Sequence, residues 1–412
     1  MSDMGRKLDS DVILVGGGLG GAATALALAE AGLDVLALDA APELEAPETF
    51  DGRAYAVALA SRRFWSAVGV WDRVADDAQE MTDILVSDGR VSEGASPLFL
   101  HFDHREMEGG VFGSMIEDGR LRAAAAAAMR DSPNVAQRFG ARVASTRRET
   151  GRATAVLETG EELSASLIVA CDGRESPLRA EAGIKRVNWA YAQNGMVSAV
   201  AHERPHEGVA HELFLPAGPF AILPLRGNRS SLVWTETRRE AARIHALDDA
   251  AYLAELESRF GDFLGALSLE GQRWTYPLHF SVAHEFVAHR LALAGDAARA
   301  IHPIAGQGLN LGVRDAAALA EVLAEAMRAG EDIGALDVLR RYQQWRRFDS
   351  AALALATDGL NRLFSNDIAP VRAIRDFGLA AVNRLPGAKR MFMKAAAGLS
   401  GETPRLMKGE AL

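Results

Sequence analysis

The chain has 412 residues, of which 49% are hydrophobic and 24% charged, a composition typical of a globular protein with room for two domains. Its formal net charge of −10 excludes a general affinity for nucleic acid, because phosphate binding needs clustered positive charge. The single cysteine, Cys171, excludes an internal disulfide and a cysteine-based metal site, and we predict no bound metal.

The first predicted elements form a β-α-β unit. Apolar runs at residues 12–15 and 35–38 predict two short strands, and the alanine-rich stretch at 22–31 predicts a helix between them. A strand, a helix and a strand in this order predict a parallel pair of strands.

A glycine-rich turn, GGGLGG at residues 16–21, joins the first strand to this helix. In this pattern Gly16 permits the tight turn, Gly18 lets the backbone approach a pyrophosphate, and Gly21 lets helix and strand pack closely. Asp39, at the end of the second strand, can accept hydrogen bonds from ribose hydroxyls and would repel a 2′-phosphate. The pattern favours FAD or NAD over NADP without distinguishing the first two. A glycine-rich turn that binds nothing is the alternative.

The second motif is a strand that ends in Asp-Gly. After a helix predicted at 120–129, residues 167–170 form an apolar run that Cys171, Asp172 and Gly173 follow. Taken alone, this motif is more typical of a turn and a helix cap than of a binding site.

The middle of the chain, residues 187–278, consists of short β-rich runs separated by Gly, Pro and Asn turn signals. We predict an antiparallel sheet inserted into the first domain. Its apolar side chains predict a substrate pocket, with ordinary core packing as the alternative. The predicted pocket residues are Phe214, Phe220, Ile222 and Trp234.

The third motif follows the inserted sheet in the sequence, in a segment that we predict to belong to the first domain. A strand predicted at 291–294 delivers Gly295 and Asp296, whose carboxylate could hold a polyol hydroxyl. The glycine-rich segment 302–312 then opens a helix, and the positive end of that helix could stabilise the anion of a reduced flavin. A purely structural loop is the alternative, and we interpret His302 as structural.

From residue 315 onward the apolar periodicity predicts helices. Residues 371–412 contain eight Lys or Arg against three Asp or Glu, opposite in sign to the whole chain, with Phe, Leu and Met interleaved. We interpret this segment as a surface for a membrane or another subunit, with a solvated helix as the alternative. No apolar run reaches the length of a signal peptide or a membrane-spanning helix, so we predict a cytoplasmic protein, peripheral at the inner face of the membrane if the segment binds lipid.

In this order and spacing, the three motifs together resemble the flavoprotein hydroxylases of the para-hydroxybenzoate hydroxylase type. The run from His302 to Asp315 is similar to the signature of the FAD-dependent hydroxylases of ubiquinone biosynthesis, and residues 51–53, 218–225 and 357–360 add to the similarity. With the elements above, we predict an α/β fold: a Rossmann-like FAD-binding domain, an inserted antiparallel β-sheet substrate domain and a helical C-terminus. The predicted ranges are 1–75, 115–186 and 287–350 for the FAD-binding domain, 76–114 and 187–286 for the substrate domain, and 351–412 for the helical region.

The resemblance also implies which residues bind FAD. These are Gly16, Gly18, Gly21 and Asp39 for the ADP half, Arg53 and Arg120 for the pyrophosphate or ribityl chain, Asp172 for the pyrophosphate side, Asp296 for the ribityl hydroxyls, and Pro303 to Asn310, with Gly306 and Gly308, for the isoalloxazine. Residues 117–119 depart from the family pattern, which weakens the assignment of Arg120. Gln307 and Pro303 are the candidate catalytic residues, through positioning of the flavin.

The implied activity is hydroxylation of the aromatic ring of a polyprenyl phenol. In this hypothesis NAD(P)H binds transiently and reduces FAD, O₂ adds to give a flavin C4a-hydroperoxide, and the electron-rich ring takes the distal oxygen. The partners are then the phenol and O₂, with residues 371–412 for a membrane or a quinone-synthesis complex. Two alternatives are a hydroxylase of a soluble aromatic acid, which requires charged groups in the pocket, and a flavin-bearing scaffold without activity.

Overall fold

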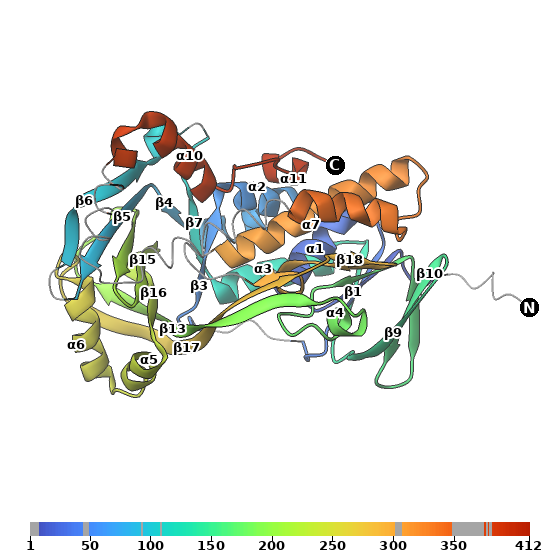
Figure 1. Ribbon diagram of the computed structural model, residues 1–412, viewed down its shortest axis with the longest axis horizontal. Helices are drawn as coiled ribbons and strands as arrows, with labels where there is room; N and C mark the ends of the chain where they lie inside the picture. The colour runs from blue at the N-terminus through green and yellow to red at the C-terminus, as the bar shows by residue number, and fades with distance from the viewer. Residues whose placement is uncertain are drawn as a thin grey trace, which may run out of the picture.

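The computed structural model describes residues 8–43, 49–91, 94–107, 109–300, 307–347, 375, 378 and 381–412. These residues form two large β-sheets that lie side by side, each with helices packed against it (Figure 1). Two long strands of the second sheet, residues 186–202 and 267–283, extend from it toward the first sheet (Figure 1).

The first sheet has six strands in the order β18-β19-β12-β1-β2-β8. Its strands are β1 (Val12–Val15), β2 (Val35–Leu38), β8 (Val135–Arg138), β12 (Leu167–Ala170), β18 (Val287–Ala288) and β19 (Leu291–Leu293). Neighbours are parallel except for the edge pair of β18 and β19. The parallel pair predicted for the start of the chain is therefore confirmed, and the strand predicted at 291–294 joins the same sheet.

Three helices pack together over the first sheet: α1 (Leu19–Glu30), α3 (Asp118–Asp131) and α7 (Gln307–Arg328). Nearly all of α1 is buried, and its many alanines let α7 and the sheet approach it closely. A small sheet adds its buried side chains to the same core. Its strands are β9 (Val143–Glu149), β10 (Arg152–Leu157) and β11 (Glu162–Ala165).

The second large sheet has eight strands in the order β20-β17-β13-β16-β15-β14-β5-β6. They are β5 (Asp83–Arg90), β6 (Gly94–Asp103), β13 (Arg186–His202), β14 (Val209–Leu215), β15 (Gly218–Leu225), β16 (Arg229–Thr237), β17 (Leu267–Ala283) and β20 (Arg299–Ala300). The predicted antiparallel pairing holds except between β14 and β5, which are parallel. Helices α5 (Arg238–His245) and α6 (Asp249–Phe260) cover one face of this sheet.

A third sheet connects the two large ones. It consists of β3 (Ala54–Ala58), β7 (Gly113–Glu117) and β4 (Gln79–Met81), with α2 (Leu59–Ala67) following β3. Strand β3 contacts α7, whereas β4 and β7 contact β15. One face of the second large sheet therefore faces the first residues of α7 across this small sheet.

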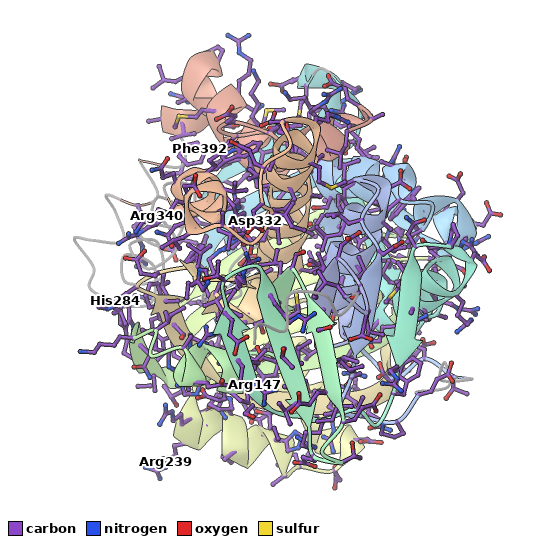
Figure 2. All side chains as sticks on the ribbon, turned by 90° about the vertical axis from the view of Figure 1, so that its right-hand side faces the viewer. Arg147, Arg239, His284, Asp332, Arg340 and Phe392 are labelled. Atoms are coloured by element: carbon purple, nitrogen blue, oxygen red, sulfur yellow. The ribbon has the colours of Figure 1, made fainter. Side chains whose placement is uncertain are left out.

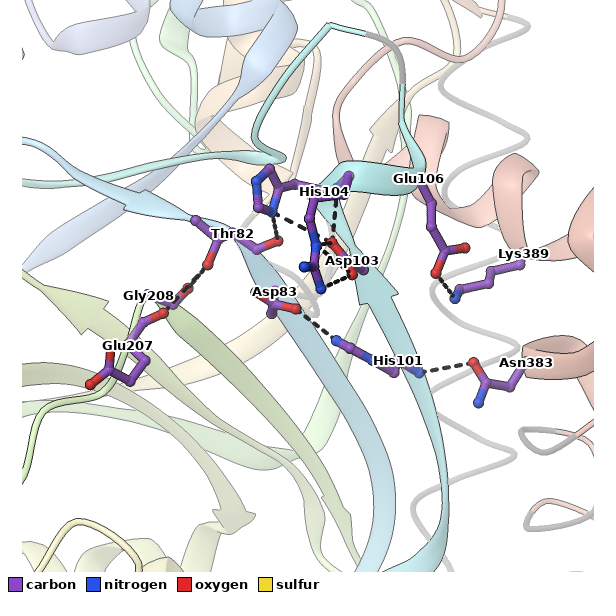
Figure 3. Close-up of polar contacts among 11 residues, drawn as sticks. Thr82, Asp83, His101, Asp103, His104, Glu106, Glu207, Gly208, Asn383 and Lys389 are labelled. Carbon is purple, nitrogen blue, oxygen red and sulfur yellow. Dashed lines mark hydrogen bonds and ion pairs between the residues drawn. The ribbon is translucent and has the colours of Figure 1, made fainter.

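The C-terminal part forms helices α10 (Pro386–Ala396) and α11 (Arg405–Lys408). Lys389 on α10 pairs with Glu106 at 2.7 Å, and the Asn383 side chain accepts a hydrogen bond from the backbone of His101 on β6 (Figure 3). Leu406 and Met407 of α11 enter the main core. The α/β class and the helical C-terminus are thus confirmed over the described residues. No helix in that part of the chain is long and apolar enough to cross a membrane.

Candidate functional site

The glycine-rich turn between β1 and α1 combines tight packing with one open face. A Cβ atom on Gly16, whose φ is +108°, would lie 2.3 Å from the carbonyl oxygen of Cys171. A Cβ atom on Gly21 would lie 1.8 Å from the carbonyl oxygen of Gly16. By contrast, nothing lies within 4 Å of a Cβ built on Gly18, the N-cap of α1. The turn thus exposes its backbone at the helix N-terminus, which no side chain caps, as a pyrophosphate site requires.

Asp39 is fixed beside this turn by two backbone N–H groups. Gly17 donates to one carboxylate oxygen at 2.8 Å and Ala41 to the other at 2.8 Å. Each oxygen keeps a second acceptor position, so the carboxylate can still accept hydrogen bonds from a ribose. This geometry fits the predicted ADP-binding role of Asp39.

Asp172 lies at the C-terminal end of β12, next to β1. One carboxylate oxygen accepts a hydrogen bond from the backbone of Leu178 at 3.2 Å, and burial raises the pKa of Asp172. The other oxygen is buried and has no partner among the described residues. A buried acceptor without a donor is rare in proteins, and a hydroxyl or amide donor of a bound group would satisfy it.

The neighbouring Cys171 is not a nucleophile, because burial raises the pKa of its thiol to about 12. Its thiol contacts the hydroxyl of Thr24 at 3.6 Å. Cys171 is therefore a packing residue.

The Gly-Asp turn after β19 is held by Asp315 on α7. The Asp315 carboxylate accepts hydrogen bonds from the backbone of Gly295 at 3.0 Å and from the guanidinium groups of Arg299 at 2.7 Å and Arg346 at 2.8 Å. Asp315 is fully buried. Asp296, by contrast, is exposed, although the protein around it displaces enough water to raise the pKa of its carboxyl group. An accessible carboxylate on a rigid turn suits the predicted contact with ribityl hydroxyls.

The first turn of α7 connects the two halves of the site. Asn310 accepts a hydrogen bond from the backbone N–H of Ala58 at 3.0 Å and donates one to the carbonyl of Ala56 at 2.9 Å, which ties α7 to β3. Gly308 is exposed, and nothing lies within 4 Å of a Cβ built on it. Gln307 is the first residue of α7.

Several predictions for this region fall outside the described residues. They concern His302, Pro303, Gly306 and the side chain of Gln307.

The two predicted arginines lie in different surroundings. Arg53 pairs with Asp51 at 2.6 Å and with the buried Asp118 at 3.3 Å, and its guanidinium stacks 4.7 Å above the ring of Trp274. Arg120 has a 62% exposed side chain, and its nearest charge partner is Asp77 at 4.0 Å. The pairing of Arg53 with Asp118, which lies in the segment that departs from the family pattern, was not predicted from the sequence.

An apolar cavity lies between the second large sheet and the first turn of α7. Four strands of that sheet, β5, β14, β15 and β16, form one wall, and β3 with Asn310 forms the other. The lining residues are Ala56, Ala58, Met81, Ile84, Val86, Phe102, Phe112, Ala210, His211, Glu212, Pro219, Ala221, Leu223, Val233, Thr235, Asn310 and Ala396.

The predicted substrate residues do not line this cavity. Phe220, Ile222 and Trp234 are buried in the core that the sheet forms with α5 and α6, on the opposite face. Phe214 points to the cavity side but packs in a cluster with Phe102 and Phe112. The reason is strand alternation: adjacent side chains point to opposite faces, so the large residues of β15 and β16 enter the core.

The residues that sequence analysis missed are the small or polar neighbours of these aromatic side chains. Ala221 lies between Phe220 and Ile222, and its small side chain leaves space on the cavity face. Glu212 is the one carboxylate of β14, whose other residues are apolar except for His211. Both signals are present in the sequence, but they become meaningful only once the buried face of each strand is known.

The family model described as the FAD binding domain matches residues 9–354. A ubiquinone hydroxylase of Rhodospirillum rubrum is 46% identical, over 98% of this chain and 94% of the relative. The 3-demethoxyubiquinol 3-hydroxylase of Escherichia coli is 34% identical, over 95% of this chain and 99% of the relative.

Solved structures share the fold at lower identity. A p-nitrophenol 4-monooxygenase from Pseudomonas putida has a TM-score of 0.76 and 21% identity, over 96% of this chain and all of that chain. An aklavinone-11 hydroxylase, solved as a ternary complex with FAD and aklavinone, has a TM-score of 0.69 and 23% identity, over 87% of this chain and 70% of that chain.

Proposed function

The chain belongs to the FAD-binding domain family and, within it, to the FAD-dependent hydroxylases of ubiquinone biosynthesis, and from this premise we propose that its apolar cavity holds the ring of a polyprenyl phenol during hydroxylation. The observation that supports this substrate site is the position of the cavity. Its wall includes Asn310 in the first turn of α7, where the third motif predicts the isoalloxazine.

The groups around the glycine-rich turn fit FAD. We assign the ADP half to the backbone at Gly18 and to Asp39, a further polar contact to Asp172, the ribityl hydroxyls to Asp296, and the flavin ring to the first turn of α7 with Gly308. Bound at these residues, FAD would supply the redox chemistry, which is acceptance of a hydride from NAD(P)H and activation of O₂ for hydroxylation of the ring. The protein contributes the open N-terminus of α1, which favours negative charge, and an apolar cavity that excludes water.

The cavity lining favours a phenol with an apolar tail over a soluble aromatic acid. An aromatic acid needs a cationic partner for its carboxylate, and the lining contains no Lys or Arg among the described residues. Its ionisable residues are His211 and Glu212, and a carboxylate such as Glu212 would repel an anionic substrate.

Helix α10 supports a peripheral contact with an anionic membrane. Leu385, Met391 and Phe392 have exposed fractions of 58%, 61% and 40%, and the exposed basic residues Arg390 and Lys394 lie among them. Figure 2 shows Phe392 on this outer helix. Ala396, at the end of α10, lines the cavity. We propose that α10 rests on the lipid surface and that the polyprenyl tail enters the cavity from there.

Not all of the basic C-terminal segment is available to a membrane. Arg375 is buried against Asp88 at 2.7 Å, Lys389 pairs with Glu106, and Met393 is buried. These residues fasten the segment to the second large sheet. We therefore narrow the proposed surface from residues 371–412 to the exposed face of residues 384–394.

The proposed division into domains follows the sheets. The FAD-binding domain would contain the first large sheet with α1, α3 and α7, and the substrate domain the second large sheet with α5 and α6. The exact boundaries 75/76, 114/115, 186/187, 286/287 and 350/351 remain predictions.

The test uses the purified protein. We expect flavin absorption bands that bleach on anaerobic addition of NAD(P)H and return with O₂. With a short-chain polyprenyl phenol in detergent micelles, mass spectrometry should detect a product heavier by one oxygen atom, labelled when ¹⁸O₂ is supplied. Turnover of 4-hydroxybenzoate, but not of the prenylated phenol, would contradict the proposed substrate class.

A further inference from the structure

Glu212 occupies the centre of the cavity wall. It lies on β14, directly opposite Val86 of β5 and Ala221 of β15 in the strand register. Both neighbours also line the cavity. Because cross-strand partners share a face, the Glu212 side chain points into the cavity from the middle of an apolar surface.

The Glu212 carboxyl group has no hydrogen bond or ion pair with any residue that the structure describes. The ionisable groups on the same strand and on the neighbouring strand β5 contact other residues. His211 borders the cavity, but its side chain points to the other face, because it lies opposite Ile222 in the strand register and its ring is 4.8 Å from that of Phe263. Asp88 on β5 is paired with the buried Arg375. A carboxyl group placed in an apolar cavity without a partner is costly for folding, so its presence suggests a ligand that uses it.

A second polar side chain on the same wall also lacks a partner. The Thr235 hydroxyl is buried, lines the cavity, and makes no hydrogen bond with the described residues. Facing this wall are Ala56 and Asn310, the side to which we assign the flavin ring. A planar substrate between the two walls would therefore place its ring substituents within reach of Glu212 and Thr235.

We infer that Glu212 is a catalytic residue that accepts the hydrogen bond, and then the proton, of the substrate's phenol hydroxyl. The phenol O–H bond breaks, its electron pair stays on the oxygen as a phenolate, and the proton forms an O–H bond with the Glu212 carboxylate. The phenolate donates electron density into the ring, which makes the ring carbon a better nucleophile toward an electrophilic oxygen. This inference rests on the proposed function, because it requires a phenol in the cavity.

The environment of Glu212 suits this exchange. Burial raises the pKa of Glu212 to about 7. As a general base it is active when ionised, so hydroxylation should increase as the pH rises through about 7 and level off above it. A phenol ordinarily has a pKa near 10, and raising the basicity of the carboxylate narrows the gap between donor and acceptor.

The test compares Glu212→Gln with the wild type and with Glu257→Gln, an exposed glutamate on α6 beyond the other face of the sheet. Glutamine keeps the shape and a hydrogen-bond acceptor but cannot take a proton. We expect E212Q to bind FAD and to be reduced by NAD(P)H as the wild type is, and to form product at least about 10-fold more slowly in single turnovers. The rise of the rate near pH 7 should disappear. A ring-fluorinated phenol, which ionises more readily, should recover most of the lost rate.

Binding gives a readout that does not depend on turnover. The ¹⁹F chemical shift of a ring-fluorinated, short-chain prenyl phenol bound to the wild type should change as Glu212 ionises near pH 7, and it should stay constant over the same pH range in E212Q. A shift that does not depend on pH in the wild type, or an unchanged pH profile of the rate in E212Q, would overturn the role of Glu212. If the shift follows the ionisation of Glu212 in the wild type but no product forms, the proposed hydroxylation fails while the assignment of Glu212 stands.

Discussion

Gly21 has the least space of any residue in the cofactor turn, and it offers a sharp test of the dinucleotide site. In Gly21→Ala the new methyl group would lie 1.8 Å from the Gly16 carbonyl oxygen, so α1 must move away from the turn. We expect this variant to bind FAD at least about 10-fold more weakly, measured by quenching of flavin fluorescence, because the N–H groups at the helix N-terminus no longer converge.

Gly20→Ala is the matched control for this substitution. Nothing lies within 4 Å of a Cβ built on Gly20, which is already helical. Alanine should therefore be tolerated and should stabilise the helix by about 0.5–1 kcal/mol. Equal FAD affinity in G21A and the wild type would show that the close packing of α1 on the turn does not position the cofactor.

At the residue scale, the role of a position can be predicted from the sequence where only one residue type satisfies the local geometry. Gly16 and Gly21 were predicted for tight turning and close packing, and the contacts at both positions require glycine. Glu212 was missed because a glutamate in an apolar strand is usually a solvated residue of the exposed face. Only the register of β14 between β5 and β15 shows that this face borders a cavity.

At the scale of elements, the strands were easier to predict than the direction of their side chains. The apolar runs that became β1, β2 and β12 are buried on both faces, so no choice of face arises. In β15 and β16 the face on which a side chain lies decides whether it can line the cavity. Side-chain size does not indicate this face, because the large residues Phe220 and Trp234 fill the core beneath α5 and α6. The parallel pairing of β14 with β5 was also beyond local sequence signals, since the two strands are far apart along the chain.

Helix α10 is the element for which the sequence left alternatives open. We expect the double variant Met391→Ser, Phe392→Ser to bind vesicles with 30% anionic lipid at least about 5-fold more weakly than the wild type, because two exposed apolar side chains no longer enter the interface. Vesicle flotation measures this. Turnover of a long-chain substrate in vesicles should fall with it, whereas turnover of a short-chain substrate in solution should not.

Phe139→Ser provides the control for α10. Phe139 has the same exposed fraction as Phe392, 40%, but follows β8 in the first large sheet. Vesicle binding that is equally weak in both variants, or unchanged in both, would contradict a specific docking face on α10. Binding that resists 0.5 M salt would in turn argue against a contribution from Arg390 and Lys394.

At the scale of the whole molecule, the main core is assembled from segments spread along the sequence. It includes β1 and α1 near the start, β12 and β19 from the middle, α7, and Leu406 near the end. The composition and the three motifs predicted this discontinuous arrangement, because each motif begins at the end of a strand. What they could not predict is how the segments are joined, since that depends on buried polar contacts between distant residues.

Asp315 makes such a contact, and it links the Gly-Asp turn to the rest of the molecule. The carboxylate and its partners Arg299 and Arg346 are all at most 1% exposed. In Asp315→Asn the two buried guanidinium groups lose the counter-charge that Asp315 supplies, so we expect the free energy of unfolding to fall by about 3–5 kcal/mol, as for other buried pairs deprived of one partner. Chemical denaturation of the FAD-loaded enzyme measures this loss.

The matched control is Glu161→Gln, which removes the charge from an exposed pair with Arg138 at 2.7 Å and should cost less than about 1 kcal/mol. Because Asp315 also holds the backbone of Gly295, D315N should release FAD more readily than its loss of stability alone requires, whereas E161Q should not. Stability and FAD affinity equal to those of E161Q would mean that the turn is held by packing rather than by this carboxylate.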